Sequence, residues 1–327
     1  MINYFFLFPG QGAQYQGMAL DLLEPPGAGG ERVRDLFSLV SEITGKDMAA
    51  LLRDSGPEIL KRTDVSQPAI TLANLAAAAY LAEKGIKPCG CAGFSLGEYA
   101  ALAVAGVISE EGCFFLVNER GKAMQAAIDR IVSENESSSA PGMAAVMGLA
   151  PEKVEALIAE WKARGGLELM NLYAANINSP RQTVVSGTAG ALAAAEDLFI
   201  AAGAKRFRRL EVAGPFHSPF MAGAAEEFKP FLEKVEFKDP QIPLYSNVLG
   251  ARVISGEEAK RLALLQITSP VRWVDEEAAI MAAGGFDACL EAGPGNVLQG
   301  LWRDLGAGIP CFAAQTALDI SKITVHE

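Results

Sequence analysis

The sequence predicts an α/β protein with a large domain built on a parallel sheet and a smaller unit inserted into it. Three observations lead to this prediction. Short apolar runs alternate with helical segments over the first 130 residues, which is typical of a parallel sheet. A serine-rich stretch then interrupts the pattern. After it, strand and helix signals follow the order βαββαβ, which is that of a ferredoxin-like unit.

The first strands and helices are predicted from apolar runs and from the glycine and proline residues that bound them. Residues 2–9 are expected to form a buried strand that ends in a turn at 10–12. Helices are expected at 31–44 and 68–84. A second buried strand is expected at 89–92, followed by a helix at 98–105 that ends at Gly106 and a longer helix at 110–131.

The smaller unit is predicted to span residues 140–212, after a linker at 133–141 that contains three consecutive serines. Its expected strands are 143–149, 169–175, 182–185 and 206–212, and its expected helices are 151–164 and 188–202. Residues 1–139 and 213–327 are then expected to form one large domain, with further strands at 242–247 and 288–292.

Composition excludes several classes of function. The formal charge of −11, from 28 Lys and Arg against 39 Asp and Glu, argues against nucleic-acid binding and against attraction to anionic membranes. The apolar runs at 4–8 and 72–81 are too short to cross a bilayer. The five cysteines match neither a disulfide framework nor zinc-ligand spacing, so a reducing cytosol is the predicted location.

A candidate nucleophile lies at Ser95, at the centre of a G-x-S-x-G pentapeptide between a predicted strand and a predicted helix. A serine hydroxyl needs a positioned base to attack at neutral pH. The chain contains only two histidines, His217 and His326, and the second is the penultimate residue. His217 is therefore the candidate base. A lone histidine is more often structural, but Pro215 and Pro219 brace this one in a short loop.

Motifs spread along most of the chain resemble one family. In order they are Phe8-Pro-Gly-Gln-Gly-Ala-Gln14, Ser66-Gln-Pro68, Gly93-Phe-Ser-Leu-Gly-Glu-Tyr99, Arg120-Gly-Lys-Ala-Met124, Asn178-Ser-Pro-Arg-Gln-Thr-Val-Val-Ser-Gly187, Phe216-His-Ser218, Ser246-Asn-Val248 and Glu291-Ala-Gly-Pro-Gly295. The chain resembles the malonyl-CoA:acyl-carrier-protein transacylases of fatty-acid synthesis and the related acyltransferase domains of polyketide synthases. The resemblance implies an α/β-hydrolase-like large domain with an inserted ferredoxin-like subdomain.

The resemblance also implies roles for particular residues. Ser95 would be the nucleophile and His217 its base, and the backbone N–H groups of Gln11 and Leu96 would bind the tetrahedral oxyanion. Arg120 would bind the free carboxylate of a malonyl group, because a guanidinium can hold a carboxylate with two hydrogen bonds. Without the resemblance, an arginine on a helix is more often solvated.

Further positions are implied as supporting residues. No aspartate matches the third place of a triad, and the family orients its imidazole by main-chain carbonyls, for which Asn247 is the matching position. Asn178 and Gln67 match positions near the family's pocket. Phe216 resembles the bulky residue of members that use malonyl rather than branched acyl groups. Phe94 departs from the family, which commonly has histidine before the nucleophile, so acyl selectivity is the property it affects.

The implied reaction moves malonyl from malonyl-CoA to the phosphopantetheine thiol of acyl carrier protein by a ping-pong mechanism, with no metal or redox cofactor. Malonyl-CoA and acyl carrier protein are the implied partners, without nucleic acid or membrane. A trans-acting acyltransferase of a polyketide pathway, a subunit of a malonate decarboxylase complex, a serine thioesterase or esterase, and a non-catalytic carrier-binding scaffold are the alternatives. Docking of an acidic carrier needs a local basic surface, for which the candidates are Lys205, Arg206, Arg208, Arg209, Lys122 and Arg181.

Overall fold

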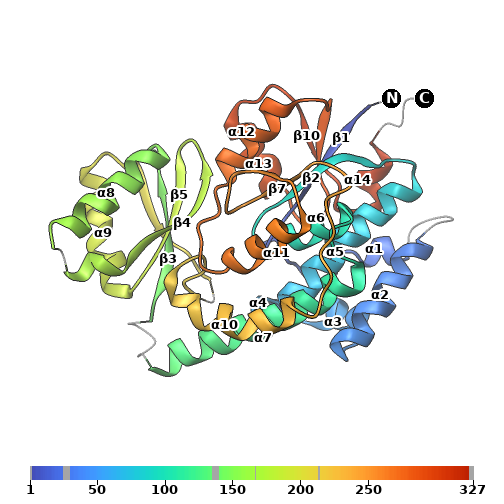
Figure 1. Cartoon of the computed structure of the whole chain (residues 1–327), viewed down its shortest axis with the longest axis horizontal. Coiled ribbons are helices and arrows are strands. Elements are labelled where there is room, and N and C mark those ends of the chain that lie inside the picture. Colours follow the sequence, from blue (N-terminus) through green and yellow to red (C-terminus); the bar gives the residue numbers. More distant parts are fainter. Residues whose placement is uncertain (1, 25–29, 135–139, 166, 213, 324–327) are drawn as a thin grey trace.

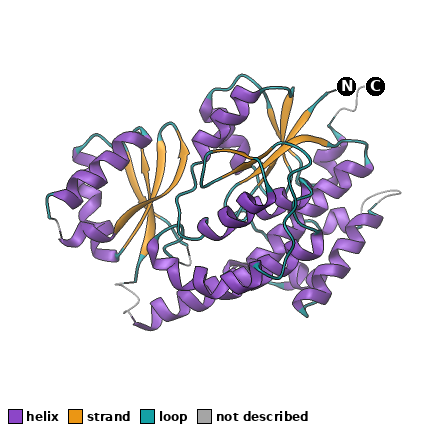
Figure 2. Cartoon of the chain, in the orientation of Figure 1, coloured by secondary structure: helices purple, strands orange, loops and turns teal. Residues whose placement is uncertain are grey.

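The computed structural model describes residues 2–24, 30–134, 140–165, 167–212 and 214–323, and it contains two separate sheets (Figure 1, Figure 2). The larger sheet has six strands, β1 (Tyr4–Phe8), β2 (Pro88–Gly93), β7 (Leu244–Ser246), β8 (Ala251–Val253), β9 (Ala288–Glu291) and β10 (Cys311–Ala313). Their order is β10-β9-β1-β2-β7-β8, and every neighbouring pair is parallel except β7 with β8. The predicted α/β fold with a parallel sheet is confirmed.

The central strand β1 is buried on both faces, as a parallel sheet covered by helices requires. Phe6 and Phe8 belong to the main core, whereas Phe5 and Leu7 pack on the opposite face with Trp273. Because side chains alternate across a strand, this short apolar run contributes side chains to the hydrophobic cores on both faces of the sheet. The polypeptide that leaves β1 carries the first glycine-rich loop.

Helices cover both faces of the larger sheet (Figure 1). They are α1 (Leu20–Leu23), α2 (Glu31–Thr44), α3 (Met48–Asp54), α4 (Pro57–Lys61), α5 (Thr63–Glu83), α6 (Gly97–Val104), α7 (Glu110–Glu134), α10 (Ala222–Leu232), α11 (Gly256–Leu265), α12 (Trp273–Ala283), α13 (Val297–Leu305) and α14 (Ala317–Ser321), with a 3₁₀ turn, η2, at Pro219–Met221. None of the helices within the described residues has the length and apolar character that crossing a bilayer demands.

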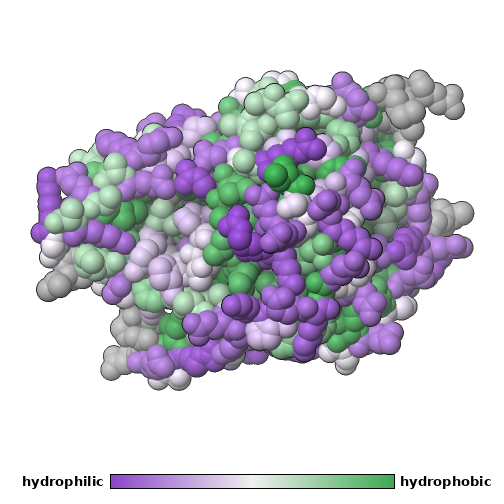
Figure 3. Space-filling view, in the orientation of Figure 1, coloured by the Kyte–Doolittle hydropathy of each residue, from purple (hydrophilic) through white to green (hydrophobic). Residues whose placement is uncertain are grey.

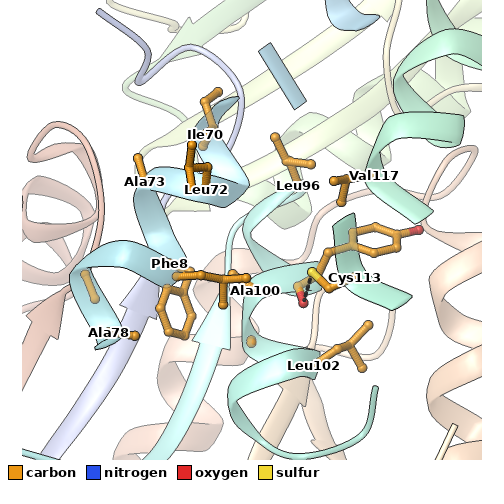
Figure 4. Packing of buried hydrophobic residues seen from close by; sticks show 14 of the residues in the cluster. Phe8, Ile70, Leu72, Ala73, Ala78, Leu96, Ala100, Leu102, Cys113 and Val117 are labelled. Carbon is orange, nitrogen blue, oxygen red and sulfur yellow. Dashed lines mark hydrogen bonds between the residues drawn. The ribbon is translucent and has the colours of Figure 1, made fainter. Parts of the chain in front are cut away.

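The helices α5 and α6 form much of the main hydrophobic core beside the larger sheet. Almost every side chain of α5 between Thr63 and Leu81 is buried, which explains its alanine-rich composition. The short helix α6 lies against β2, and Figure 4 shows Ala100 beside Phe8 of β1 and Leu96 near Val117 of α7. The elbow between β2 and α6 is therefore fixed by packing on both sides.

The smaller sheet consists of β3 (Gly142–Met147), β4 (Leu172–Ser179), β5 (Gln182–Gly187) and β6 (Arg206–Arg209), in the order β4-β5-β3-β6 with antiparallel pairs. Two helices, α8 (Pro151–Ala163) and α9 (Ala189–Ala201), cover its outer face and form a separate core with it. This arrangement is the predicted βαββαβ unit. Met143, Ala145 and Val184 point the other way and join the main core.

The structure differs from the predicted elements mainly at their ends. The helix expected at 68–84 starts at Thr63, with Pro68 inside it, and β4 starts at Leu172 because Leu167–Asn171 forms a 3₁₀ turn, η1. The sequence did not predict β8, β10 or the helices from α10 onward. Strands of three residues show no periodic pattern. The linker predicted at 133–141 overlaps α7 at its start and otherwise lies mainly outside the described residues, and the domain boundaries at 140 and 212 stay predictions.

Substitution of Gly97 by alanine is expected to destabilise the protein by about 3 kcal/mol, because overpacking a core forces backbone to shift. A Cβ atom at Gly97 would lie 2.0 Å from the carbonyl oxygen of Phe8 and 2.9 Å from that of Pro9. Thermal unfolding is the measurement. The matched control is Gly190→Ala in α9, where a Cβ meets no atom within 4 Å. Equal melting temperatures for the two variants would contradict this account of the elbow.

Candidate active site

Ser95 lies in the tight turn that joins β2 to α6, with a backbone φ of 50°. Left-handed backbone is uncommon outside glycine, and such strain persists only where the surroundings enforce it. Here the backbone on either side of Ser95 packs closely enough to hold this conformation. A Cβ at Gly93 would lie only 2.1 Å from the backbone of Gly97, so this approach requires glycine. The predicted elbow conformation is therefore present, and it holds the serine side chain in a fixed direction at the start of α6.

His217 lies in the loop after β6, also with a positive φ, of 54°. The Oγ atom of Ser95 is 2.8 Å from Nε2 of His217, so the two residues that lie 122 positions apart in the chain form one hydrogen-bonded pair. Nδ1 lies 2.9 Å from the carbonyl oxygen of Gln266 and 3.2 Å from that of Ser269. Because carbonyls only accept, Nδ1 carries the proton and Nε2 accepts from the serine hydroxyl.

Burial, with a further contribution from the positive charge of Arg120, lowers the pKa of His217 to about 4. The imidazole is 5% exposed, so its charged form has little contact with water. At neutral pH the ring is uncharged and Nε2 is free to take the serine proton. A general base needs this protonation state before the reaction starts.

The expectation that Asn247 supplies the carbonyl for His217 is wrong. The carbonyl oxygen of Asn247 accepts from the backbone N–H of Arg272 at 2.8 Å. The side chain of Asn247 instead holds the elbow, because Oδ1 accepts from the backbone N–H of Ser95 at 2.6 Å and Nδ2 donates to the carbonyl of Gly93 at 2.7 Å. Asn247 thus supports the nucleophile, and the imidazole is oriented by carbonyls further along the chain.

Gln266, which follows α11, is a site residue that the sequence did not reveal. Its Nε2 donates to the carbonyl of Ser95 at 2.9 Å and to the carboxylate of Glu98 at 2.8 Å. Its Oε1 accepts from Nη2 of Arg120 at 3.0 Å. Gln266 therefore contacts the nucleophile Ser95, the base His217 and the cation Arg120. It belongs to no motif, and it lies 146 residues from Arg120 and 171 from Ser95 in the chain, so only the tertiary structure brings it there.

Arg120 lies on α7 and is only 1% exposed, yet its side chain lines the cavity in front of Ser95. Within the described residues it forms no ion pair, and its buried Nε has no hydrogen-bond partner. Burial lowers its pKa, but an arginine remains charged in proteins. A buried, charged guanidinium with an unused donor is well suited to an anionic ligand.

The cavity has a volume of about 560 Å³ and is lined from both sheets. The larger part contributes Gln11, Phe94, Ser95, Arg120, Phe216 and His217, and the smaller part contributes residues that include Met143, Asn178, Gln182 and Val184. Figure 3 shows apolar residues gathered over the middle of the visible face, whereas most of the surrounding surface is hydrophilic. Ser95 and Arg120 therefore line the same cavity, to which both parts of the protein contribute.

The remaining predicted residues lie in different places around this space. Asn178 donates from Nδ2 to Oε1 of Gln182 at 2.8 Å, and its buried Oδ1 has no partner among the described residues. Gln67 is fully buried and lies behind the wall, with Nε2 3.2 Å from the sulfur of Met124. Phe94 packs edge-on against Trp273, with ring centroids 5.4 Å apart, so an apolar ring takes up this part of the wall.

The backbone N–H groups of Gln11 and Leu96 make no hydrogen bond to any described part of the protein. Leu96 follows Ser95 at the N-terminus of α6, where unpaired N–H groups favour negative charge. The Gln11 loop is held close to the elbow, because a Cβ at Gly10 would lie 2.3 Å from the carbonyl oxygen of Phe94. The two amides are thus available on neighbouring segments.

Comparison with known proteins identifies the family of this chain. The family described as acyl transferase domain matches residues 5–307. The chain belongs to this family. A malonyl CoA-acyl carrier protein transacylase of Bacillus subtilis is 36% identical over 308 residues, which cover 94% of this chain and 92% of that protein. A polyketide biosynthesis malonyl CoA-acyl carrier protein transacylase of the same organism is 35% identical over 92% of this chain and 96% of that protein.

Solved structures of acyl transferase family members have the same overall fold. The malonyl CoA-acyl carrier protein transacylase of Coxiella burnetii superposes with a TM-score of 0.86 at 30% identity, covering 98% of this chain and 96% of that chain. A malonyl-transacylase solved in complex with its type II polyketide acyl-carrier protein also gives a TM-score of 0.86, at 34% identity and 98% coverage of both chains. The likeness therefore includes both sheets.

The imidazole of His217 is expected to stay uncharged above about pH 5 and to bind a proton only as the pH falls through about 4. The unfolded chain takes up this proton near the ordinary histidine pKa of about 6.5. The burial of His217 therefore reduces the stability of the fold progressively as the pH drops below about 6.5. An NMR titration of the imidazole Cε1–H signals is the measurement, and His326→Gln removes the second histidine signal. A His217 midpoint near 6.5 would be incompatible with this environment.

Proposed function

We propose that the protein transfers the malonyl group from malonyl-CoA to the phosphopantetheine thiol of an acyl carrier protein, through an acyl-enzyme on Ser95. One observation carries this proposal: the Ser95–His217 pair and the guanidinium of Arg120, whose Nε has no hydrogen-bond partner among the described residues, line one cavity. The pair suits acyl transfer through a serine ester, and the cation suits an acyl group that ends in a carboxylate. The names of relatives at about 36% identity agree with both parts.

In the first half-reaction, Oγ of Ser95 attacks the thioester carbonyl while Nε2 of His217 takes the hydroxyl proton. The carbonyl oxygen becomes an oxyanion, which the N–H groups of Gln11 and Leu96 are placed to bind. The C–S bond then breaks, and His217 returns the proton to the departing CoA thiolate. The products are CoA and a malonyl ester on Ser95.

The second half-reaction repeats these steps in reverse with a different thiol. His217 takes the proton of the phosphopantetheine thiol, whose sulfur attacks the ester carbonyl. The tetrahedral intermediate collapses, the bond to Oγ breaks, and the proton passes to Ser95. Nδ1–H of His217 remains bonded to the carbonyls of Gln266 and Ser269 throughout, so these dipoles stabilise the transient imidazolium without a carboxylate.

Acyl carrier protein is the proposed acceptor, and an exposed basic strand is the proposed docking surface. Arg206, Arg208 and Arg209 on β6 are exposed, next to exposed Lys205. The neighbouring Leu210, Glu211 and Val212 line the cavity, so this strand leads directly to its entrance. Lys122, in contrast, is paired with Glu119. The cytosol is the proposed location, in keeping with five cysteines that are all free thiols.

Brief mixing with malonyl-CoA is expected to add one malonyl group to the protein, as measured by intact mass. Ser95→Ala is expected to remain unmodified, and the adduct should be lost when holo acyl carrier protein is added, with malonyl-carrier protein as the product. Saturating release of free malonate without a thiol acceptor would instead indicate a thioesterase. An equal adduct on Ser95→Ala would exclude the elbow as the reactive site.

Substitution of Arg120 by alanine is expected to lower kcat/KM for malonyl-CoA about 100-fold, because the substrate carboxylate would be left unpaired in a buried site. Transfer of an acetyl group, which has no carboxylate, should not fall in parallel. The matched control is Arg130→Ala on the same helix, since Arg130 forms an ion pair with Glu227 at the surface. An unchanged preference between malonyl and acetyl groups would refute the role of Arg120.

A further inference from the structure

Glu98 is a buried carboxylate immediately behind the nucleophile, and neither half-reaction uses it. It lies in the first turn of α6 and is 3% exposed. Its Oε2 accepts from the backbone N–H of Asn247 at 3.0 Å and from Nε2 of Gln266 at 2.8 Å. A carboxylate is rarely buried in a protein, because removing its charge from water costs free energy. The contacts of Glu98 therefore point to a role in the site.

The two partners of Glu98 are the residues that hold the rest of the site. Asn247 binds the backbone N–H of Ser95 at the elbow. Gln266 binds the imidazole through its carbonyl and Arg120 through its side chain. A single carboxylate oxygen therefore fixes the orientation of nucleophile, base and cation through one intermediate residue each.

The side chain of Gln266 bridges Glu98 and Arg120, because its Nε2 donates to Glu98 and its Oε1 accepts from Nη2 of Arg120. Burial raises the pKa of Glu98 to about 7, and hydrogen bonds from Asn247, Gln266 and Ser246, followed by the charge of Arg120, oppose this rise. The carboxyl group is thus near the midpoint of its titration at neutral pH. When ionised, Glu98 offsets part of the positive charge of Arg120, which lies on the other side of the Gln266 side chain.

Other titratable groups lie around Glu98, and their pKa values are shifted as well. Burial raises the pKa of Glu276, on α12, well above its ordinary value, and the charge of Glu98 adds to this rise. Burial also raises the pKa of Tyr99, on the same helix as Glu98, and of Cys113, on α7. His217 is uncharged, with a pKa of about 4. Burial also raises the pKa of Glu277, next to Glu276, to about 8. Glu98 is distinguished within this cluster by its contacts, because it accepts hydrogen bonds from both Asn247 and Gln266.

We propose that Glu98 is a positioning residue that also sets acyl specificity: its carboxylate holds Gln266 and Asn247 in place and competes with the substrate carboxylate for the charge of Arg120. The inference rests on the proposed function, because it takes the malonyl carboxylate as the ligand of Arg120. Ionised Glu98 weakens the attraction of Arg120 for malonyl. Protonated Glu98 leaves the full positive charge to the substrate.

Protonation changes the charge of Glu98 without removing its hydrogen bonds. Oε2 still accepts from Asn247 and Gln266 in the acid form, and the hydroxyl of Ser246 can accept from the acid proton instead of donating. Positioning therefore persists in both states, while specificity changes. Since binding of malonyl and of the proton favour each other, malonyl affinity is highest below about pH 7 and falls as the pH rises through it.

The test measures binding of malonyl-CoA and acetyl-CoA to Ser95→Ala by calorimetry, between about pH 5.5 and about pH 8.5, a range that brackets the pKa of Glu98. The malonyl carboxyl group stays ionised over this range, and the CoA portion is common to both ligands. The ratio of the two dissociation constants therefore isolates the acyl group. We expect the preference for malonyl-CoA to fall about fivefold as the pH rises through about 7.

Glu98→Gln in the same Ser95→Ala background mimics the protonated carboxyl group. Its amide oxygen can accept from Asn247 and Gln266, and its NH₂ group can donate to Ser246. We expect its preference for malonyl-CoA to stay at the low-pH value at every pH. The matched control is Glu277→Gln, because Glu277 is a neighbouring buried carboxylate that bonds to Trp273 and not to the site. The control should keep the pH dependence.

The outcomes separate this inference from the proposed function. A preference for malonyl-CoA that does not change with pH in Ser95→Ala would overturn the inference alone. The same follows if Glu98→Gln keeps the pH dependence or Glu277→Gln abolishes it. No preference for malonyl-CoA at any pH would overturn both the inference and the proposed role of Arg120. The pH series on Ser95→Ala needs no substitution at Glu98, so a misfolded Glu98→Gln would leave that test intact.

Discussion

The close contact between Gly97 and the end of β1 is the constraint on which the site depends. A side chain at position 97 would overlap the carbonyl oxygen of Phe8, so the start of α6 lies directly against the strand that leads into the Gln11 loop. This approach places the amides of Gln11 and Leu96 on adjacent segments and forces Ser95 into left-handed backbone. The strain is offset by packing of α6 against β1, β2 and α7 (Figure 4).

Around this turn, Asn247, Gln266 and Glu98 connect buried polar groups into one hydrogen-bonded network. Asn247 and Gln266 each contact three or more partners, and both contact the same oxygen of Glu98. Polar groups in a low-dielectric interior are costly when unpaired but hold a defined geometry when paired. The network gives the imidazole its tautomer through carbonyl dipoles, and the base remains uncharged because it is buried beside a cation.

The smaller sheet completes the site from the other side. One face of it forms a core with α8 and α9, and residues of the opposite face, such as Met143 and Val184, line the cavity. Arg120 is thus enclosed by a wall that is separate in sequence from the elbow. A charge held in such a partly dry space acts more strongly on a ligand than one in water. Enclosure by two sheets therefore adds to the specificity that Arg120 provides.

The sequence by itself determined the α/β class, the βαββαβ order and the serine–histidine pair, because these depend on local periodicity, on the glycines of the elbow and on there being only two histidines. Only the tertiary structure decided which groups orient that pair. The carbonyls of Gln266 and Ser269 lie 49 and 52 residues from His217, and a backbone carbonyl is present at every position, so no residue type marks them. The family resemblance implied Asn247 for this role, and the structure gives it to Gln266 and Ser269 instead.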